Sequence, residues 1–268
     1  MFNKKDVQDF WNNSSCGENL YLVGQTEQEA YINHSLMRYK LEPYIIDFAN
    51  FKNSYDKKIL EIGVGLGADH QNFAQNGANL TGIDLTERAI NYTKKRFQIY
   101  NLYSNLLIGD AENLSFDDEN FDMVYSWGVI HHSPNTCKAV SEIYRVLKHD
   151  GEARIMIYYK YSLVGFMLWF RYAFLNCKPF RSLSYIYSNY LESPGTKAYS
   201  IKEAKNLFKD FKYIDIKTVL THGDLLESKA GQRHEGLFLS LARFIFPRKI
   251  IKFFLPNAGL FMLIIAKK

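Results

Sequence analysis

KKILEIGVGLG, residues 57–67, joins a short apolar run to a turn that has glycine at every second position. Such a run is typical of a buried parallel strand, and glycines at its end let the backbone turn sharply and approach a ligand closely. The helix that follows would offer free N–H groups to that ligand. Because tight strand–helix turns also use glycine for packing alone, the motif needs support from the rest of the chain.

Four further segments end in a polar or glycine feature, as parallel strands do where they deliver side chains to one edge of a sheet. Residues 79–84, NLTGID, end at Asp84, about twenty residues past the glycine turn, where an acid suits two hydrogen bonds to ribose hydroxyls. The other three segments are LLIGDA (106–111), FDMVYS (121–126) and ARIMIYY (153–159). The series predicts an open α/β sheet with a ligand crevice at the carboxyl ends of its strands.

This ordered series resembles the class I S-adenosylmethionine-dependent methyltransferases. The matching pieces are EIGVGLG, LTGIDLT, GDAENLSFDDENFDMVYS and EIYRVLKHDG, and the run SWGVIHHSPN is similar to small-molecule enzymes of that class, including the quinone C-methyltransferase group. The resemblance implies a Rossmann-like, seven-stranded, mostly parallel sheet with helices on both faces. It also implies S-adenosylmethionine as the methyl donor and S-adenosylhomocysteine as the product. The turn has the form E-x-G-x-G-x-G rather than G-x-G-x-x-G, which disfavours an NAD-dependent dehydrogenase.

The resemblance implies a role for each strand end in holding the cofactor. The glycine turn would surround the methionine moiety, Asp84 would bind the ribose, and Asp110 would meet the adenine edge. Ser126 and Trp127 would lie under the amino acid portion of the cofactor. The full expected set is Glu61, Gly63, Gly65, Gly67, Asp84, Leu85, Asp110, Ala111, Ser126 and Trp127.

Three side chains are candidates for catalysis: His131, His132 and Tyr158. The histidines follow the fourth strand, where methyl group and substrate should meet, and imidazole can take a proton from a hydroxyl or an activated carbon acid. The plainer interpretation is that one histidine caps the next helix or hydrogen-bonds the cofactor loop. Tyr158 and Tyr159 end the fifth strand facing opposite ways, so at most one of them enters the crevice.

The part of the chain before the first strand is expected to fold over the crevice, as is common in the resembled family. Apolar residues recur over 27–48 with near-helical spacing, which predicts a helix with one break. A loop is expected over 9–17. Trp11 and Tyr21 would then either cover the adenosyl or methyl end of the cofactor or fasten the extension to the sheet.

Two long insertions set this chain apart, one after the fifth strand and one before the last. Loops this long in a compact domain usually form active-site lids, so both are expected to roof the substrate. The predicted organisation is an N-terminal extension or lid over 1–55, a cofactor-binding core over 56–159, a cap insertion over 160–199, and a C-terminal part of the core over 200–268 with a second insertion at about 222–257.

Bulky side chains in the insertions have two possible uses. Phe166, Trp169, Phe170 and Phe174 have the spacing of a helix with one face in the core, although they could instead line an aromatic pocket. Residues 242–254 mix basic and bulky apolar side chains, which favours a dimer or lid contact and, as the less ordinary alternative, a membrane surface. The candidate substrate contacts are Trp11, Tyr21, Tyr159, Trp169, His222 and Arg233.

Composition narrows the class of protein. The 268 residues are 47% hydrophobic and 23% charged with a net charge of +5, as in an ordinary globular protein, and the scattered basic residues argue against a nucleic-acid partner. Cys16, Cys137 and Cys177 fit neither a disulfide framework nor a metal site, so free thiols in the cytoplasm and no metal are expected. No signal peptide is apparent, and the apolar run 163–170 is too short to span a bilayer.

The sequence therefore predicts a cytoplasmic S-adenosylmethionine-dependent methyltransferase, monomeric or homodimeric, that methylates O, N or C of a small organic metabolite. One alternative is a methyltransferase for a lipid-linked or quinone-like substrate at the membrane surface. An alternative of another class is a non-catalytic protein that binds S-adenosylmethionine or S-adenosylhomocysteine, which the intact cofactor motifs disfavour.

Overall fold

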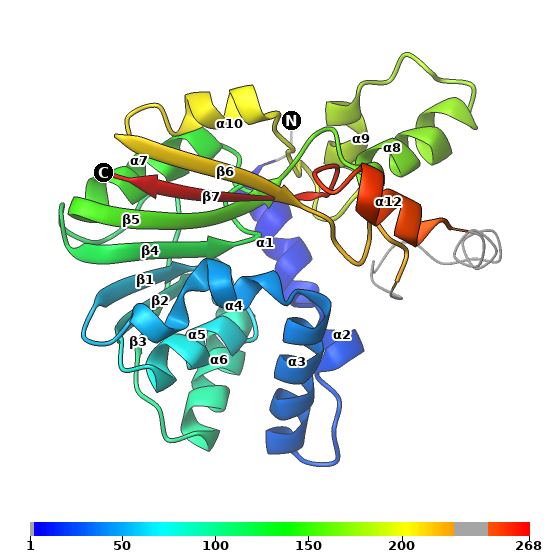
Figure 1. Cartoon of the computed structure of the whole chain (residues 1–268). Coiled ribbons are helices and arrows are strands. Elements are labelled where there is room, and N and C mark those ends of the chain that lie inside the picture. The colour runs from blue at the N-terminus through cyan, green and yellow to red at the C-terminus, as the bar shows by residue number, and fades with distance from the viewer. Residues whose placement is uncertain (1–2, 228–245) are drawn as a thin grey trace.

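A seven-stranded sheet forms the centre of the computed structural model, which describes residues 3–227 and 246–268 (Figure 1). Its strand order is β3-β2-β1-β4-β5-β7-β6. The strands are β1 (Lys58–Ile62), β2 (Asn79–Asp84), β3 (Asn105–Ile108), β4 (Phe121–Trp127), β5 (Leu147–Tyr158), β6 (Tyr213–Val219) and β7 (Phe261–Lys267). The strands β1 to β5 pair in parallel, and β7 runs antiparallel between β5 and β6. The predicted Rossmann-like architecture is confirmed.

Helices cover both faces of this sheet. On one face lie α4, α5 and α6, and on the other lie α7 and α10 (Figure 1). The helices are α1 (Lys4–Asn13), α2 (Glu18–Tyr21), α3 (Glu27–Leu41), α4 (Tyr44–Ala49), η1 (Phe51–Asn53), α5 (Ala68–Gln75), α6 (Glu87–Ile99), α7 (Thr136–Val146), α8 (Leu163–Trp169), η2 (Phe170–Phe174), α9 (Leu183–Tyr190), α10 (Ile201–Leu207) and α12 (Arg248–Phe254).

Alternation along the central strands divides the core into two layers. In β1, Ile59 is buried among the aromatic side chains of α4 and α5, while Leu60 and Ile62 are buried on the α7 side. Because both faces are covered, the parallel strands are almost continuously apolar rather than alternating. The same arrangement brings the carboxyl ends of β1, β2 and β4 to one edge.

Several local expectations from the sequence are confirmed. The helix expected over 27–48 breaks at Pro43 into α3 and α4. Thr86, which the sequence offers as an N-cap for the helix after Asp84, caps α6 by accepting a hydrogen bond from the N–H of Ala89.

Three expectations were wrong. Residues 9–13 belong to α1 rather than to a loop, because Asn3 and Asp6 form a capping box that starts the helix earlier. The His149-Asp150-Gly151 run, which in the sequence indicates a turn before the fifth strand, lies inside β5, where a register shift against β4 and a positive φ at Asp150 keep the strand continuous. The aromatic face of the helix after β5 points outward rather than into the core: Phe166, Phe170 and Phe174 are about half exposed, and the smaller Gly165, Leu168 and Ala173 are buried instead.

Within the described ranges, no helix combines the length and the apolar character needed to cross a bilayer. All three cysteines are exposed and free.

Candidate active site

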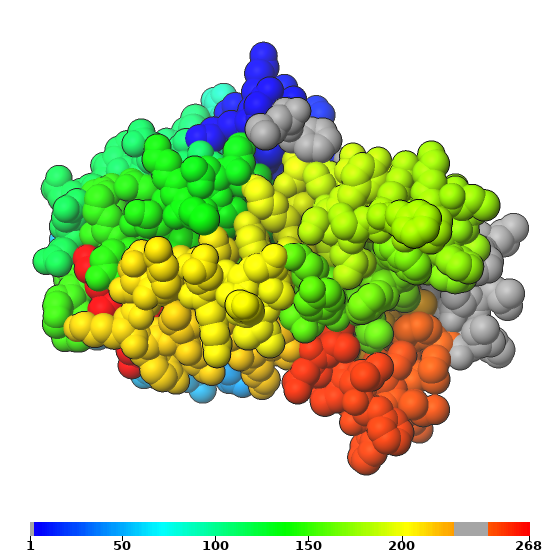
Figure 2. Space-filling view, turned by 90° about the horizontal axis from the view of Figure 1, so that it is seen from above, coloured from blue at the N-terminus to red at the C-terminus, as the bar shows by residue number. Residues whose placement is uncertain are grey.

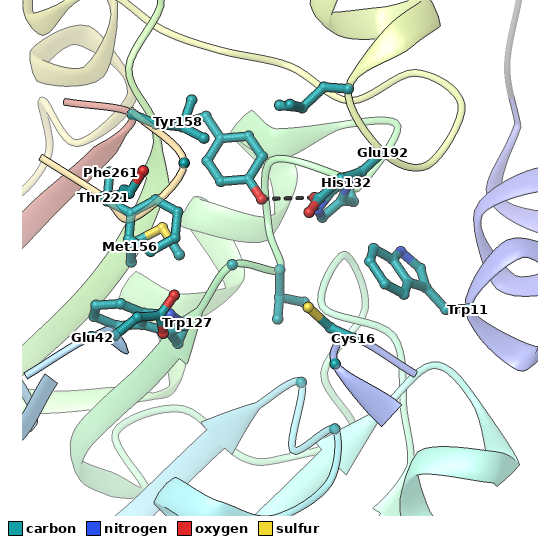
Figure 3. A pocket seen from close by; sticks show the side chains of 18 of the residues that line it. Trp11, Cys16, Glu42, Trp127, His132, Met156, Tyr158, Glu192, Thr221 and Phe261 are labelled. Atoms are coloured by element: carbon teal, nitrogen blue, oxygen red, sulfur yellow. Dashed lines mark hydrogen bonds and ion pairs between the residues drawn. The ribbon is translucent and has the colours of Figure 1, made fainter. Parts of the chain in front are cut away.

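A cavity of about 1300 Å³ lies at the carboxyl ends of the parallel strands. Its floor comes from the β1, β2 and β4 ends, one wall from α1 to α3, and its roof from α8, η2 and α12. Ligand pockets are usually about 300–1,000 Å³, so this cavity has room for two ligands side by side. Figure 3 shows its centre, with Glu42 and Trp127 on one side and Tyr158, His132 and Glu192 on another.

The glycine turn after β1 shapes one end of the cavity. Gly63, Gly65 and Gly67 all have positive φ, at 85°, 53° and 75°. A Cβ on Gly63 would meet Val129 at 2.1 Å, and a Cβ on Gly67 would meet Thr93 at 2.8 Å. A Cβ on Gly65 would meet nothing within 4 Å. Close packing therefore explains why residues 63 and 67 are glycines. Gly65 instead leaves open space where the backbone lines the cavity.

Asp84 ends β2 directly beside that turn. One carboxylate oxygen accepts the N–H of Gly65 at 3.2 Å, and the other accepts the N–H and hydroxyl of Thr86 at 2.9 and 2.8 Å. Burial raises the pKa of Asp84 although these hydrogen bonds oppose the rise. The bonds fix the carboxylate at the cavity wall, where Leu85 also lies, and leave further lone pairs for a ligand.

Asp110 lies at the cavity wall beyond β3 and is joined to the N-terminal helix. It accepts the N–H of Glu112 at 2.9 Å and forms an ion pair with Lys4, which also pairs with Glu112 at 3.1 Å. Gly109 and Ala111 line the cavity beside it. Helix α1 is thus anchored over this end of the cavity by charge.

Glu61 is held by buried neutral partners rather than presented as a free carboxylate. It lies 2.8 Å from His70 Nδ1, and His70 Nε2 lies 2.8 Å from the hydroxyl of Ser104. Because Ser104 donates to the Leu80 carbonyl, His70 must donate from Nε2, and its Nδ1 is left to accept the proton of a neutral Glu61. Burial raises the pKa of Glu61 well above its usual range and lowers that of His70 to about 3, as this arrangement requires.

The end of β4 places its two polar residues differently. Trp127 lines the cavity beneath Arg38, whose guanidinium carbon lies 5.9 Å from the ring centroid. Ser126 is fully buried, donates to the Ile62 carbonyl at 3.0 Å, and is absent from the cavity lining. Ser126 therefore links β4 to β1, and the expected contact of its side chain with a cofactor is not retained.

The sequence reasoning missed a charged cluster from α3 and α5. Arg38 donates to both oxygens of Asp69, at 2.9 and 2.5 Å, and the hydroxyls of Tyr39 and Tyr125 donate to the same carboxylate. Burial would raise the pKa of Asp69, but Arg38 and these hydrogen bonds outweigh it and hold the pKa below its usual value. No local motif marks these residues, because the helices meet only in the folded chain.

Glu42 follows α3 and also faces the cavity, near Arg38 and Trp127 (Figure 3). Burial raises its pKa to about 7, although Arg38 opposes the rise. A carboxyl group that titrates near neutral pH in a ligand cavity is a candidate partner for a cationic ligand group.

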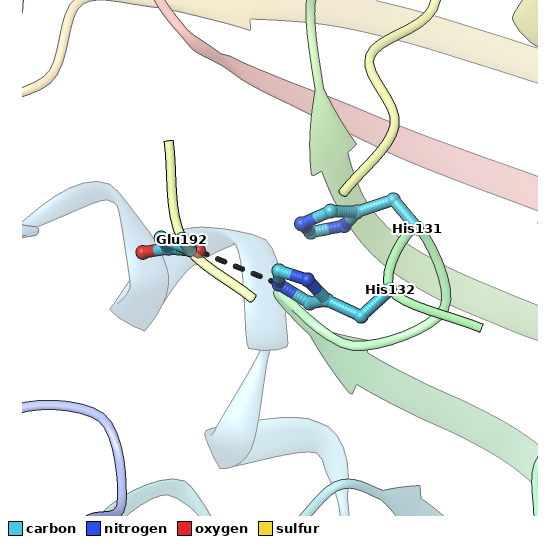
Figure 4. Close-up of side chains that lie close together, drawn as sticks. All are labelled: His131, His132 and Glu192. Carbon is cyan, nitrogen blue, oxygen red and sulfur yellow. Dashed lines mark ion pairs between the residues drawn. The ribbon is translucent and has the colours of Figure 1, made fainter. Parts of the chain in front are cut away.

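The opposite side of the cavity holds His132, Tyr158 and Glu192, of which Tyr158 and Glu192 are joined by a hydrogen bond. The Tyr158 hydroxyl donates to Glu192 Oε2 at 2.7 Å, and His132 Nε2 lies 3.4 Å from the same oxygen (Figures 3 and 4). Ser193 and Thr196 hold His132 Nδ1 at 2.8 and 3.0 Å. Burial and the nearby Glu192 charge raise the pKa of Tyr158 well above its usual range, so the phenol keeps its proton at neutral pH.

His131 lies next to His132, and its ring does not take part in the pair with Glu192 (Figure 4). It is fully buried, neither ring nitrogen has a hydrogen-bond partner, and it does not line the cavity. Its ring packs against Tyr158 at 4.0 Å between centroids, and burial holds its pKa well below the usual value. One ligand atom each of His131, His132 and Glu192 lies within 4.8 Å of the other two, a spacing that could also hold a metal ion.

The remaining predicted substrate residues separate into two groups. Trp11, Tyr21 and His222 line the cavity, and Trp11 meets the His132 ring edge-on at 5.4 Å. Tyr159 and Trp169 do not line it. Tyr159 points to the opposite face of the sheet, as alternation required, and the Trp169 indole donates to the Arg181 carbonyl at 2.9 Å. Arg233 lies outside the described residues.

The sequence of this chain is similar to those of known methyltransferases. Residues 60–155 match a protein family described as "Methyltransferase domain". A phthiotriol/phenolphthiotriol dimycocerosates methyltransferase of Mycobacterium tuberculosis is 38% identical over 97 residues, covering 35% of each chain. A fatty-acid O-methyltransferase of Mycolicibacterium smegmatis is 35% identical over 97 residues, again 35% of each chain. The chain thus spans about a third of the length of these relatives.

Solved structures share the fold over almost the whole chain. Phosphoethanolamine N-methyltransferase 2 of Haemonchus contortus, in complex with phosphomonomethylethanolamine and S-adenosylhomocysteine, covers 98% of this chain and 60% of its own, with a TM-score of 0.61 and 16% identity. A possible histamine N-methyltransferase of Thermotoga maritima covers 98% and 99%, with a TM-score of 0.54 and 18% identity.

Proposed function

We propose that this chain, whose residues 60–155 match the family described as "Methyltransferase domain", is a class I S-adenosylmethionine-dependent methyltransferase that transfers a methyl group to an O, N or C atom of a small organic molecule. The observation that carries the proposal is the meeting of the glycine turn, Asp84 and Trp127 in one cavity with the His132–Tyr158–Glu192 set. Cofactor-type and proton-accepting groups thus face the same space.

The residues present fit the cofactor. Gly65 leaves open space at the turn, and Asp84 is fixed with lone pairs to spare for ribose hydroxyls. Asp110 and Ala111 would border the adenine, with Leu85 against its face, and Glu42 and Arg38 would take the charged ends of the methionine moiety. When bound, S-adenosylmethionine supplies a methyl group on a sulfonium, which is already a good leaving group.

The chain then has to position the acceptor, exclude water and accept its proton. We assign proton acceptance to the Glu192 carboxylate, because Tyr158 donates to it and His132 lies 3.4 Å from it. Tyr158 and His132 would orient that carboxylate, while buried His131 would pack behind them rather than touch substrate. A substrate O–H, N–H or acidic C–H would thus lose its proton to Glu192 as its bond to the methyl carbon forms.

The cap side of the cavity favours an acceptor with an apolar part. Apolar residues of the cap line it, namely Leu163, Val164, Phe166, Met167, Leu168, Phe170, Leu175, Leu191, Leu226, Phe246, Ile251 and Leu255. Relatives named for fatty-acid and dimycocerosate substrates agree with such a wall, and another is named for phosphoethanolamine. A lipid-linked or quinone-like substrate is therefore a second candidate beside a smaller metabolite. We place the activity in the cytoplasm, with the chain as a monomer or homodimer.

The test of this function is transfer of tritium from methyl-labelled S-adenosylmethionine to a panel of acceptors. The panel should hold matched hydroxyl, amine and activated-carbon compounds with short and long apolar chains. We expect label in at least one acceptor with an apolar chain and none in its fully polar counterpart. Cofactor binding without transfer to any acceptor would favour the non-catalytic binding protein.

Glu42 predicts how binding of the product should depend on pH. Its carboxylate would pair with the ammonium group of S-adenosylhomocysteine, but with a pKa of about 7 it holds a proton below neutral pH. Affinity measured by calorimetry should therefore fall about tenfold from pH 8 to pH 6. Glu42→Gln should bind more weakly at pH 8 and lose most of this slope. A variant with the wild-type slope would assign the titration to another group.

A further inference from the structure

The cap presents an unusual outward face of bulky apolar side chains. Phe166, Phe170 and Phe174 of α8 and η2 are 46–53% exposed, and Ile250, Phe253 and Phe254 of α12 are 59–77% exposed. We call these six side chains the cap face. Helical spacing had suggested that the first three pack into the core, yet they do not. Phe170 stacks on Phe174 with ring centroids 5.3 Å apart, and Phe253 meets Phe254 at 4.9 Å, so each half of the cap face is a cluster of exposed rings. Exposed apolar clusters of this kind mark interaction sites rather than ordinary surface.

The two halves of the cap face lie on neighbouring elements. The Leu163 N–H, at the start of α8, donates to the Ala258 carbonyl just after α12, at 2.9 Å. Both views show α8 and α12 together at the end of the molecule beyond the carboxyl ends of the strands (Figures 1 and 2).

Every charged residue in the two segments that carry the cap face is basic. Residues 161–191 contain no aspartate or glutamate, and neither do residues 246–260. The same two segments contain six basic residues: Arg171, Lys178, Arg181, Arg248, Lys249 and Lys252. Bulky apolar residues interspersed with cations, without acids, are the pattern of segments that lie in the interface of an anionic membrane.

The cap face is continuous with the cavity. Phe166 and Phe170 are about half exposed and also line the cavity, and Leu255, at the end of α12, does both as well. An apolar chain that enters from a surface on which these side chains lie would pass Phe166, Phe170 and Leu255 on its way into the cavity. The cap face and the cap side of the cavity are therefore both suited to contact with an apolar chain.

We propose that the cap face docks the protein on an anionic lipid surface, and that an acceptor with an apolar chain enters the cavity from that surface. The docking is inferred from the cap face alone, whereas the entry of substrate also depends on the proposed function. A second copy of the chain fits less well as the occupant. A two-fold dimer through this face would bring two sets of six cations together with no acid in either segment to offset them.

One basic residue of the cap has a different task. The Arg248 guanidinium donates to the carbonyls of Leu225 and Leu226, at 2.9 and 3.1 Å, and so holds the loop after β6. Charge reversal there would disturb the fold. Lys249 and Lys252 are exposed and provide the better test of charge, since Lys252 has only an exposed ion pair with Glu227.

The experiment is co-sedimentation of the full chain with vesicles of phosphatidylcholine alone and of phosphatidylcholine with phosphatidylglycerol. The wild-type chain should sediment with the anionic vesicles and be released by salt. Phe253→Ser/Phe254→Ser should lower the partition coefficient by about tenfold or more, and Lys249→Glu/Lys252→Glu should abolish the preference for anionic vesicles. Tyr103→Ser, a matched loss of a 91% exposed aromatic in the loop before β3, should change nothing.

Wild-type protein that stays in the supernatant with both vesicles would overturn the proposal. So would a Phe253→Ser/Phe254→Ser variant that sediments like the wild type. A concentration-dependent dimer in ultracentrifugation that the same variant loses would assign the cap face to a second copy instead. Titration with S-adenosylhomocysteine separates this result from the proposed function. None of the five substituted side chains lines the cavity, so these variants should bind S-adenosylhomocysteine like the wild type whether or not they bind vesicles.

Discussion

Glu192→Gln is expected to lower kcat by about 10²- to 10⁴-fold, the range that a positioned general base contributes. The amide keeps the shape of the side chain and can still accept from Tyr158, but it cannot take the proton of the substrate. The residues that we assign to the cofactor lie on the other side of the cavity, so affinity for S-adenosylhomocysteine should stay within about threefold. The measurement is tritium transfer to the acceptor that the wild-type enzyme uses best.

Two controls sharpen this result. Glu87→Gln removes an exposed carboxylate at the start of α6, outside the cavity lining, and should leave kcat unchanged. Tyr158→Phe removes only the hydrogen bond that orients Glu192, so its loss should be smaller, about tenfold. A Glu192→Gln variant with wild-type kcat would show that the acceptor arrives already deprotonated or that another group takes the proton.

Chelation distinguishes proton acceptance from metal binding by the same side chains. With Glu192 as the base, dialysis against EDTA should leave transfer activity unchanged. Activity that disappears on chelation and returns with Zn²⁺ would mean that His131, His132 and Glu192 hold a metal ion, which contradicts the role given to Glu192 here.

Asp84→Ala is expected to weaken binding of S-adenosylhomocysteine by about 1–3 kcal/mol, or roughly 5- to 150-fold in Kd, the scale of hydrogen bonds lost to a charged group. The substitution also frees the N–H of Gly65, which the carboxylate now fixes at 3.2 Å, so the glycine turn should become less well ordered. Calorimetry gives the affinity, and thermal unfolding without ligand gives the cost to the fold.

A matched variant separates these two effects. Asp122→Ala removes a carboxylate that accepts the Lys58 N–H and pairs with Lys148 at the amino end of the sheet, far from the cavity lining. It should lower stability without changing affinity. If Asp84→Ala bound S-adenosylhomocysteine like the wild type, the ribose site would have been misplaced.

The sequence predicted the sheet because its evidence is local. Each buried strand is a short apolar run, and each run ends in a turn whose glycine or acid is adjacent in the chain, as at Gly63 and Asp84. Predicting that these residues lie at one edge of the sheet required no information about long-range contacts, because parallel strands bring their carboxyl ends together.

The missed residues depend on contacts between distant segments. Arg38 and Asp69 meet because α3 packs against α5, and Glu192 reaches the cavity only through the path of the cap. Neither has a motif of its own. Glu61 shows a different limit: its position was predicted, but its protonation follows from His70 and Ser104, which lie in other elements.

The aromatic residues of the cap show what the periodicity of a sequence cannot predict. Spacing of three and four residues identifies one face of a helix, and Phe166, Phe170 and Phe174 do share a face. Periodicity does not say which face is buried. Here the small residues Gly165 and Ala173 face inward, so the large side chains lie outside.

Titration of the purified wild-type chain with S-adenosylhomocysteine by calorimetry tests the central claim most directly. The account predicts one site per chain with micromolar affinity, weaker at pH 6 than at pH 8 and weaker again in Asp84→Ala. An absence of binding at either pH, from a chain that unfolds cooperatively, would contradict the assignment of this cavity to the cofactor.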